Sequence, residues 1–206
     1  MKRAAVDPEF VARRTATFSL SGGTRVRLRP IVPGDKAGLV AGFRRMSVAS
    51  RYRRFMTPLE ELDDDMLRHL TELDYVNHFA WLALLPDEPD EPGVGVARYV
   101  RLPDEPEVAE AAVAVIDAYQ RRGIGTLLLE ALGAVALENG IRTLRGYVLD
   151  ENRDMREVVE GVGARLIHDT PGLLRAEVDV AARADQLRGT PLGESLRGLA
   201  RGEGSG

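Results

Sequence analysis

Two glycines separated by one residue, Gly123 and Gly125, stand in the stretch QRRGIGT at residues 120–126, between an apolar run and a run with helical spacing. Backbone N–H groups in the first turn of a helix have no partner inside the helix, and the helix dipole adds partial positive charge there. A glycine turn at a helix start is therefore suited to binding phosphate. Arg121 and Arg122 add two positive charges to the same turn.

Three kinds of phosphate-binding loop begin with such a glycine pair. A dinucleotide-binding loop requires a third glycine where this chain has Leu128, and a P-loop requires a lysine directly after its last glycine, which neither glycine here has. The remaining match is the stretch from Gln120 to Gly125, which fits the pattern Arg/Gln-x-x-Gly-x-Gly/Ala. In this stretch the chain resembles the GNAT superfamily of N-acetyltransferases.

Two upstream segments extend the resemblance. The sequence SVASRYRRFMTPLEEL, residues 47–62, and the sequence MLRHLTELDYVNHFAWLAL, residues 66–84, are similar to the catalytic domain of bacterial Pat-type protein lysine acetyltransferases. A Ser-Arg-Tyr-x-Arg-Phe stretch and an Asp-Tyr pair before the second strand carry this similarity. It implies the GNAT fold, an α/β (α+β) architecture in which helices flank a mixed, mostly antiparallel central sheet, and splayed central strands hold acetyl-CoA.

The same resemblance implies where acetyl-CoA would bind. Its pyrophosphate would lie on the backbone amides of the glycine turn, and its pantetheine arm would run along the preceding strand. Asn152 would reach the pantetheine or its phosphates, although an asparagine at this place equally fits a helix N-cap. The expected cofactor-binding residues are Val113, Ala114, Val115, Gln120, Arg121, Arg122, Gly123, Ile124, Gly125, Thr126 and Asn152.

Glu110 is a carboxylate in an otherwise apolar strand. A lysine ammonium has a pKa near 10.4, so only about 0.1% of it is neutral and nucleophilic near pH 7.4, and a general base is useful. Glu110 matches the position of the catalytic glutamate in Pat-like enzymes, and burial would tune it toward that role. The alternative is an edge-facing or salt-bridged carboxylate, for example one paired with Arg98 or Arg101, with Glu107 as the reserve base.

One residue that many GNAT enzymes use is missing. They carry a tyrosine seven residues after the helix-start asparagine, as the general acid for the leaving thiolate, and counting from Asn152 gives Val159. A CoA thiol has a low enough pKa to leave without that acid. The chain contains no cysteine, so the acetyl group would pass directly from acetyl-CoA to the amine rather than through an enzyme thioester.

Several charged residues allow two interpretations. The acidic run from Glu60 to Asp65 could attract a cationic lysine, but it also fits the first turn of a helix. The arginines at 51, 53 and 54 could bind an acidic partner surface or the 3′-phosphate of CoA, and a structural role is equally open for Arg51 and Tyr52. No metal site is expected, because the histidines share no ligand spacing: His69, His78 and His168.

Composition sets broad limits. The chain has 206 residues, of which 44% are hydrophobic and 29% charged, as is usual for a globular domain. A net charge of −4 argues against a general nucleic-acid binder. The N-terminus lacks the apolar region of a signal peptide, and no apolar stretch reaches the roughly 18 residues of a membrane span. We therefore expect a cytoplasmic protein with no membrane partner.

The order of elements predicts one domain. We expect a flexible lead-in over residues 1–22, an acetyltransferase domain over residues 23–180, and a partly disordered tail over residues 181–206. Apolar spacing predicts two or three helices between residues 35 and 73, one that ends at Asn139-Gly140, and one over 150–163. Strands are predicted at 24–30, 78–85, 94–102, 107–116, 143–149, 164–167 and 173–180.

Three functions stay open on this basis. The first is an acetyl-CoA-dependent N-acetyltransferase whose partners are proteins that present lysine. The second keeps the chemistry but acts on a small amine, such as a polyamine, an amino acid or an aminoglycoside. The third is a non-catalytic module of the same fold that binds acyl-CoA, for which the missing tyrosine leaves some room.

Overall fold

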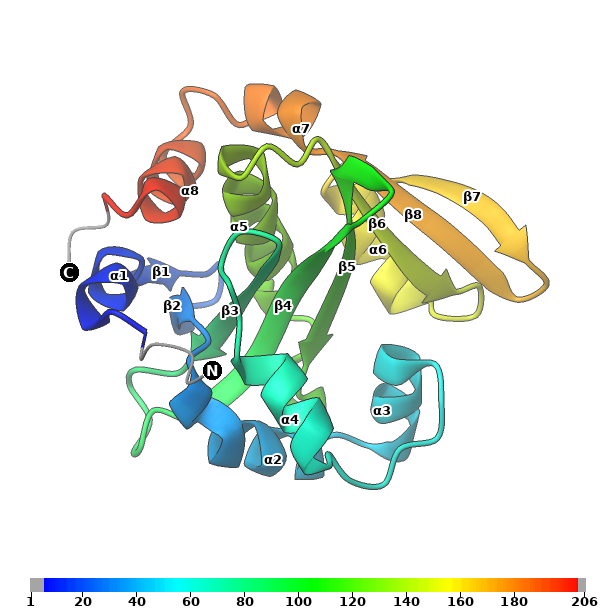
Figure 1. Cartoon of the computed structure of the whole chain (residues 1–206), viewed down its shortest axis with the longest axis horizontal. Helices are drawn as coiled ribbons and strands as arrows, with labels where there is room; N and C mark the ends of the chain where they lie inside the picture. The colour runs from blue at the N-terminus through cyan, green and yellow to red at the C-terminus, as the bar shows by residue number, and fades with distance from the viewer. Residues whose placement is uncertain (1–5, 204–206) are drawn as a thin grey trace.

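A single eight-stranded sheet runs through the computed structural model, which describes residues 6–203 (Figure 1). Its strand order is β1-β2-β3-β4-β5-β6-β8-β7. Every neighbouring pair is antiparallel except β5 and β6. The strands are β1 (Ala16–Ser19), β2 (Arg25–Pro30), β3 (His78–Leu84), β4 (Gly93–Leu102), β5 (Glu105–Val115), β6 (Thr143–Leu149), β7 (Arg165–Thr170) and β8 (Leu173–Asp179). The mixed, mostly antiparallel sheet is confirmed.

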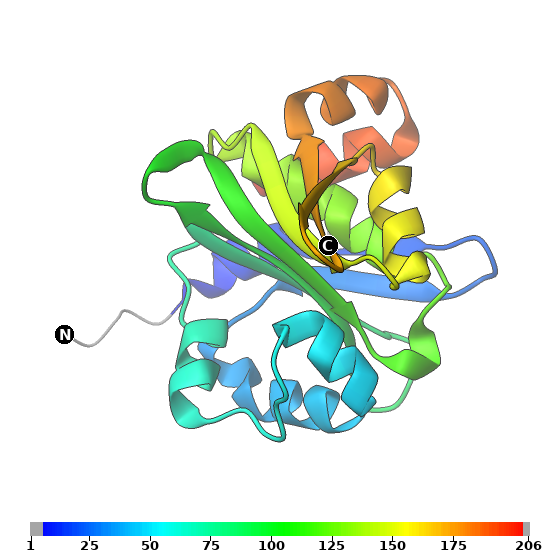
Figure 2. The same ribbon diagram turned by 90° about the vertical axis from the view of Figure 1, so that its right-hand side faces the viewer.

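Helices cover both faces of this sheet (Figure 2). They are α1 (Pro8–Arg13), α2 (Lys36–Arg44), α3 (Val48–Phe55), α4 (Asp64–Thr71), α5 (Ile124–Glu138), α6 (Arg153–Gly161), α7 (Val180–Gln186) and α8 (Pro191–Arg201). The second, third and fourth helices lie on one face, and α5 packs on the other, with α7 and α8 against it. No helix in the described part of the chain is long and apolar enough to cross a membrane.

Alternation along the strands divides the core between the two faces. In β3, the odd-numbered residues Phe79, Trp81 and Ala83 join the large cluster that α5 completes. The even-numbered Ala80, Leu82 and Leu84 join a smaller cluster, together with Ile31 and Leu73, on the opposite face. Successive side chains of a strand point to opposite faces, so a strand that is buried on both faces reads as a continuous apolar run. This explains the run HFAWLALL in the sequence.

The parallel pair β5 and β6 forms a fork. Only three residue pairs join these strands: Val108 with Thr143, Ala109 with Leu144, and Glu110 with Arg145. Both strands continue past that point, β5 to Val115 and β6 to Leu149, and they diverge as they do so (Figure 1). The splayed central strands expected from the sequence are therefore present.

The structure differs from the expected lead-in and tail. Residues 16–19 of the expected flexible segment 1–22 form β1 and pair with β2, and residues 191–201 of the expected partly disordered tail form α8. Apolar side chains at both ends reach the main core, which stabilises these elements. The side chains involved are Phe10, Phe18, Leu20, Leu196, Leu199 and Ala200. The outermost residues of both predicted segments, 1–5 and 204–206, lie outside the described part.

Candidate active site

The glycine turn joins the end of β5 to the start of α5. Gly123 is the N-cap of α5 and has φ of +84°, in the left-handed region that favours glycine. The first hydrogen bond of the helix runs from the amide of Leu127 to the carbonyl of Gly123, at 3.0 Å. The amides of Ile124, Gly125 and Thr126 therefore have no acceptor inside the helix. This turn can donate to an anion, as its sequence predicts.

Side chains around the turn have different roles. Gln120 donates to the carbonyl of Val115 at 2.9 Å and so ties the turn to the end of β5. Arg121 is exposed and lies 4.0 Å from Asp154 of α6. Arg122 instead donates to the carbonyl of Ala118, and its guanidinium lies over the ring of Tyr119. Of the two arginines, Arg121 is the one that faces the cleft described next.

A cleft of about 1210 Å³ follows the fork between β5 and β6. Residues 110–115 of β5 line it, together with the glycine turn, β6, α6 and α3, and it continues toward α7 and α8. Most of the residues predicted to bind the cofactor therefore meet at one place. The members of that set that line the cleft are Val113, Ala114, Val115, Gln120, Arg121, Gly123, Gly125, Thr126 and Asn152. The side chain of Ile124 is buried in the main core instead.

Glu110 lies at the vertex of the fork. It occupies the last paired position of β5, opposite Arg145, and its side chain lines the cleft. The expectation that Glu110 is buried is wrong, since its side chain is exposed. The strand positions it so because Ala109 takes the core-facing place in the alternation and Glu110 takes the opposite face.

The alternative partners proposed for Glu110 are engaged elsewhere. Arg98 is buried, donates to the carbonyl of Leu70 at 3.1 Å, and contacts the ring of His78. Arg101 donates to Asn77 and to two carbonyl groups, those of Pro106 and Asn139. The reserve base Glu107 is paired with Arg142 at 3.3 Å and does not line the cleft. The salt-bridged alternative is therefore wrong, whereas the exposed side chain of Glu110 agrees with an edge-facing carboxylate.

Arg54 of α3 is the cation that acts on Glu110. Both side chains line the cleft. Burial lowers the pKa of Arg54 to about 10, and the negative charge of Glu110 opposes that decrease. Arg54 therefore remains protonated at neutral pH and places a positive charge on the same side of the cleft as Glu110.

Asp117, which sequence reasoning missed, fixes α3 to the glycine turn. Its carboxylate accepts hydrogen bonds from the backbone N–H of Ser47 at 2.9 Å, the hydroxyl of Ser47 at 2.7 Å and the hydroxyl of Ser50 at 2.8 Å. Burial works to raise the pKa of Asp117, but these hydrogen bonds outweigh it and lower the pKa. The pair of serines at the start of a predicted helix was the available signal, but their partner is 67 to 70 residues away.

Asn152 has the capping role that was one of its two interpretations. Its side-chain oxygen accepts a hydrogen bond from the amide of Met155 at 3.3 Å, at the start of α6, and the residue also lines the cleft. Val159, at the place where a tyrosine was sought, is buried beside Val148 and Ala176. It brings no proton donor to the cleft.

The acidic run ends in the first turn of α4 and does not face the cleft. Asp63 caps that helix by accepting from the amide of Met66 at 2.8 Å, and Asp65 pairs with Arg68. None of the residues from Glu60 to Asp65 lines the cleft. Arg51 has a structural role, because its guanidinium donates to the carbonyl groups of four residues: Phe43, Arg44, Met46 and Glu60.

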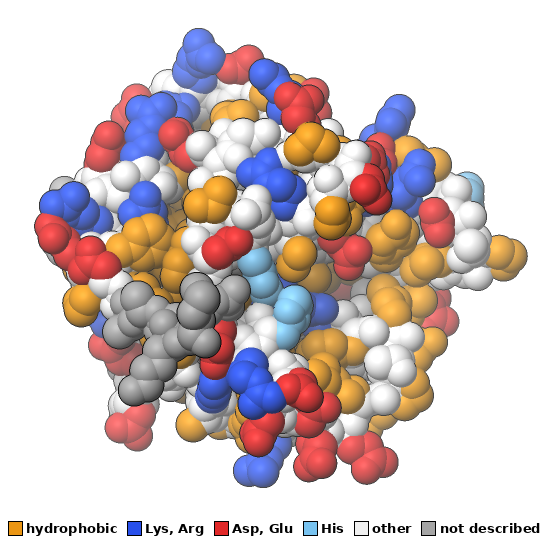
Figure 3. All heavy atoms as spheres, viewed as in Figure 1, with side chains coloured by type: hydrophobic (Ala, Val, Ile, Leu, Met, Phe, Trp, Pro, Cys, Tyr) orange, Lys and Arg blue, Asp and Glu red, His pale blue; other side chains and the backbone are white. Residues whose placement is uncertain are grey.

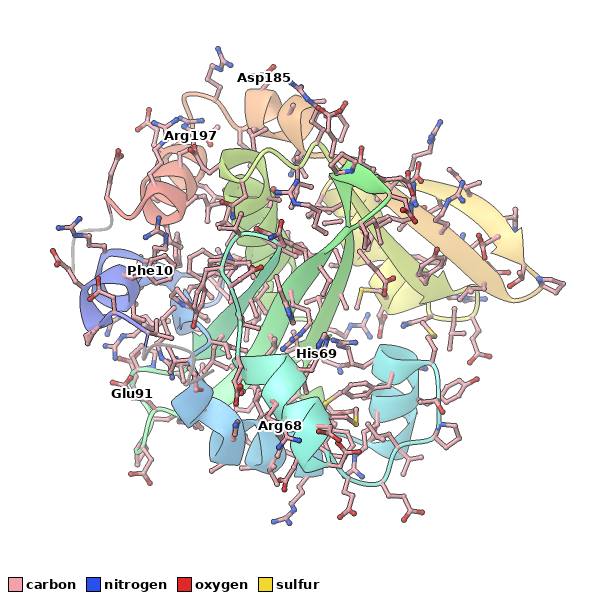
Figure 4. The ribbon with its side chains drawn as sticks, in the orientation of Figure 1. Phe10, Arg68, His69, Glu91, Asp185 and Arg197 are labelled. Atoms are coloured by element: carbon pink, nitrogen blue, oxygen red, sulfur yellow. The ribbon has the colours of Figure 1, made fainter. Side chains whose placement is uncertain are left out.

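Two histidines lie side by side on the face of the molecule that carries α4. The ring centroids of His69 and His78 are 4.8 Å apart, and Figure 3 shows two neighbouring histidines in the middle of this face. Figure 4 places His69 between α4 and the sheet. Burial and then the charges of Arg98 and Arg54 lower the pKa of His69. Within residues 6–203, no group of three or more potential ligand side chains is placed to hold a metal ion.

Comparison with known proteins gives consistent matches. The model of the family described as Acetyltransferase (GNAT) domain matches residues 25–165. The chain is 35% identical over 153 residues to Acetyltransferase Pat of Mycolicibacterium smegmatis; the match covers 74% of this chain and 45% of that protein. It is 31% identical over 145 residues to Acetyltransferase PA5475 of Pseudomonas aeruginosa, covering 70% of this chain and 77% of that protein.

One solved structure resembles the whole arrangement. The crystal structure of the GNAT domain of S. lividans PAT superimposes with a TM-score of 0.75 and 31% sequence identity. The superposition covers 82% of this chain and 98% of that domain. This chain spans less than half the length of the Mycolicibacterium relative but nearly the full length of the S. lividans domain.

Proposed function

This chain belongs to the GNAT acetyltransferase family and is an N-acetyltransferase, and from that membership we propose that it acetylates the ε-amine of lysine side chains in proteins. Acetyl-CoA is the proposed donor, as in other enzymes of the GNAT fold, and Glu110 is the proposed general base. Residues 23–180 form the proposed acetyltransferase domain. We also propose a cytoplasmic location, where the donor and a large pool of protein acceptors are both available.

The observation that carries this proposal is the position of Glu110 at the vertex of the fork. Beyond this residue, the edge of β5 that faces β6 has no partner strand, so its backbone groups are available to a pantetheine arm beside Val113 and Val115. With the pyrophosphate on the amides of the glycine turn, such an arm would point its thioester toward the vertex. A carboxylate that lines the same cleft is then suitably placed for the incoming amine.

The proposed reaction needs no covalent enzyme intermediate. Glu110 accepts a proton from the lysine ammonium, and the neutral amine attacks the carbonyl carbon of the thioester. The carbon–sulfur bond then breaks, CoA leaves as a thiolate, and the nitrogen passes its second proton to solvent water as the amide forms. Val159 donates no proton at this step, so the thiolate leaves without help from that position. The backbone N–H groups of β5 near Val113 are the proposed donors to the developing oxyanion.

The exposure of the site suits a protein acceptor. Glu110 is exposed, and so is Met56, which lines the same cleft, so a lysine on another protein has room to approach. The upstream segment 47–62, which resembles part of the Pat-type catalytic domain, contains α3, and residues of α3 line that mouth. These two features favour proteins over a small amine enclosed in a pocket.

The deciding experiment measures acetyl-CoA turnover by release of free thiol. Proteins from a chemically deacetylated lysate and a panel of small amines serve as separate acceptors, and mass spectrometry locates the acetyl groups. We expect acetyl-lysine on proteins and little turnover with polyamines, amino acids or aminoglycosides. Turnover confined to a small amine would instead assign the enzyme to metabolite acetylation, and tight CoA binding without any turnover would indicate a binding module.

A further inference from the structure

The outer face of α3 carries an exposed apolar stripe. Val48, Tyr52 and Met56 follow one another at four-residue intervals and are 81%, 43% and 36% exposed. Val48 and Tyr52 lie on one face of α3, and Met56 is the C-cap residue directly after the helix. Of the six large hydrophobic side chains exposed in the described part of the chain, these three gather at one element. A grouped apolar surface of this kind is typical of an interaction site, whereas single exposed apolar residues are not.

This stripe is continuous with the mouth of the cleft. Met56 lines the cleft, as do Arg53 and Arg54 from the adjacent face of α3. Tyr147 of β6, which is 38% exposed, lines it from the other side of the fork. Figure 3 shows hydrophobic side chains over the region that α3 occupies in Figure 1. A polypeptide that delivers a lysine to Glu110 would therefore cross this helix.

The α3 side of this mouth carries positive charge. Within residues 6–203, neither Arg53 nor Arg54 has a carboxylate within the 4.0 Å of an ion pair. Glu110 acts on Arg54 from a longer distance. The acidic run at 60–65 does not contribute, since none of its residues lines the cleft. The α3 side of the cleft therefore presents two guanidinium groups without a paired carboxylate, and an acidic side chain beside the acceptor lysine would be attracted to them.

The helix that carries these groups is held in place. Asp117 accepts three hydrogen bonds from Ser47 and Ser50 at the N-terminal end of α3, so this end is joined to the turn after β5. The glycine turn follows directly in the chain. The stripe, the two arginines and the proposed acetyl-CoA site therefore keep a fixed relation to one another. Such preorganisation favours selection among acceptors by their fit to one surface.

We propose that α3 is the acceptor-recognition helix, and that it selects protein segments in which an acidic residue and an apolar residue flank the acceptor lysine. The acidic residue lies against Arg53 and Arg54, and the apolar residue lies on the stripe of Val48, Tyr52 and Met56. This inference rests on the proposed lysine acetyltransferase function. It adds the chemistry by which one lysine is preferred over another.

The test compares peptides that share one central lysine and one apolar flanking residue, with Asp, Ala or Arg at the neighbouring positions. For the wild-type chain, we expect kcat/KM to be about tenfold higher with Asp than with Arg, the scale of a partly screened charge interaction whose sign is changed. Arg53→Glu is expected to invert this order, and Arg53→Gln to give an intermediate ratio. Arg13→Glu on α1 is the matched control, because Arg13 is an exposed arginine on another element.

The stripe is tested by Tyr52→Ser, which removes apolar surface without opening the core. We expect the advantage of an apolar over a serine flanking residue to fall about fivefold, with the acetyl-CoA affinity used to show that the fold is intact. Equal rates for all peptides, with no inversion by Arg53→Glu, would refute the inference and leave the lysine acetyltransferase function standing. Acetylation of small amines but of no peptide or protein would refute both. A wild-type dimer that Tyr52→Ser dissociates would show that a second copy covers the stripe, and would also refute it.

Discussion

Glu110 and Arg145 stand opposite each other at the last paired position of the parallel ladder, yet their side chains do not pair. The guanidinium of Arg145 donates hydrogen bonds to the carboxylates of Glu105, at 2.7 Å, and Glu177, at 3.2 Å, and these hydrogen bonds raise the pKa of Arg145. The carboxylate of Glu110 makes no hydrogen bond or ion pair with any residue in the described part of the chain. An uncommitted carboxylate therefore lies at the vertex of the fork.

Glu110→Gln tests that carboxylate directly. Because the variant keeps the shape of the side chain but cannot accept the proton, we expect kcat to fall at least about 100-fold, the usual scale for the loss of a general base. The melting temperature and the affinity for acetyl-CoA should stay close to wild type, since the side chain is exposed. Glu107→Gln, on the same strand but outside the cleft, is the control and should retain activity. A Glu110→Gln variant that keeps its activity would show that Glu110 is not the general base.

Gly123→Ala tests the geometry of the glycine turn. The φ of +84° at this N-cap is unfavourable for any residue with a Cβ atom, so we expect a loss of about 1 kcal/mol in unfolding free energy. Relaxation of the turn should also weaken acetyl-CoA binding several-fold, which calorimetric titration measures. Gly38→Ala in α2 is the matched control, because Gly38 is helical and a Cβ there meets nothing within 4 Å. If both variants bind acetyl-CoA alike, the turn is not the anion site.

Much of this fold follows from local sequence. The alternation in residues 24–30, the continuous apolar run of β3, and the three- and four-residue spacing before Leu73 each identified an element that the structure contains. The terminal elements β1 and α8 were not predicted, because their apolar residues are sparse and the surfaces that cover them come from distant segments. Arg14, for example, donates to the carbonyl of Ala200 at 3.2 Å, which joins the two ends of the chain.

The candidate site, too, was only partly predictable from the sequence. The glycine turn and the position of Glu110 within a strand were readable from the residues, because a turn and an alternation are local properties. The exposure of Glu110 was not readable, because it depends on how far β6 diverges from β5. The role of Asp117 also depends on contacts over 67 to 70 residues of sequence, which no local pattern reports.

Asp117→Ala tests the attachment of α3. The variant loses three hydrogen bonds to a carboxylate, and we expect it to lower the unfolding free energy by about 1 to 2 kcal/mol and to raise the KM for a peptide acceptor more than the Kd for acetyl-CoA. Thermal denaturation and the two binding measurements check this. Asp65→Ala is the control, because it removes only an exposed ion pair with Arg68. Equal effects on acceptor and donor would show that Asp117 does not act through α3.

The buried pair of Glu130 and Arg183 joins α5 to α7. Glu130 is only 5% exposed, and Arg183 donates to it from Nε at 2.9 Å. Arg183→Ala leaves a buried carboxylate without its partner, so we expect a loss of about 3 kcal/mol in urea denaturation. Adding Glu130→Leu should recover much of that loss. Arg188→Ala, which removes only the exposed pair with Asp185, should cost less than about 1 kcal/mol.

His69 gives the folded state a dependence on pH. The groups around it are the ring of His78, the guanidinium groups of Arg98 and Arg54, and the charged residues that line the same hollow, Arg68, Glu72 and Asp74. Burial, followed by the charges of Arg98 and Arg54, lowers the pKa of His69 below the ordinary 6.5. As the pH falls below about 6.5, the unfolded chain takes up a proton that the folded chain does not, so folding stability decreases. Above 6.5 the full contribution is present. The melting temperature of His69→Gln should therefore fall less between pH 7.5 and about pH 5 than that of wild type.

Arg54→Gln should also reduce this fall in melting temperature, because it removes one of the charges that lower the pKa of His69. If the melting temperatures of the wild type and both variants fall by the same amount over this pH range, His69 does not cause the dependence.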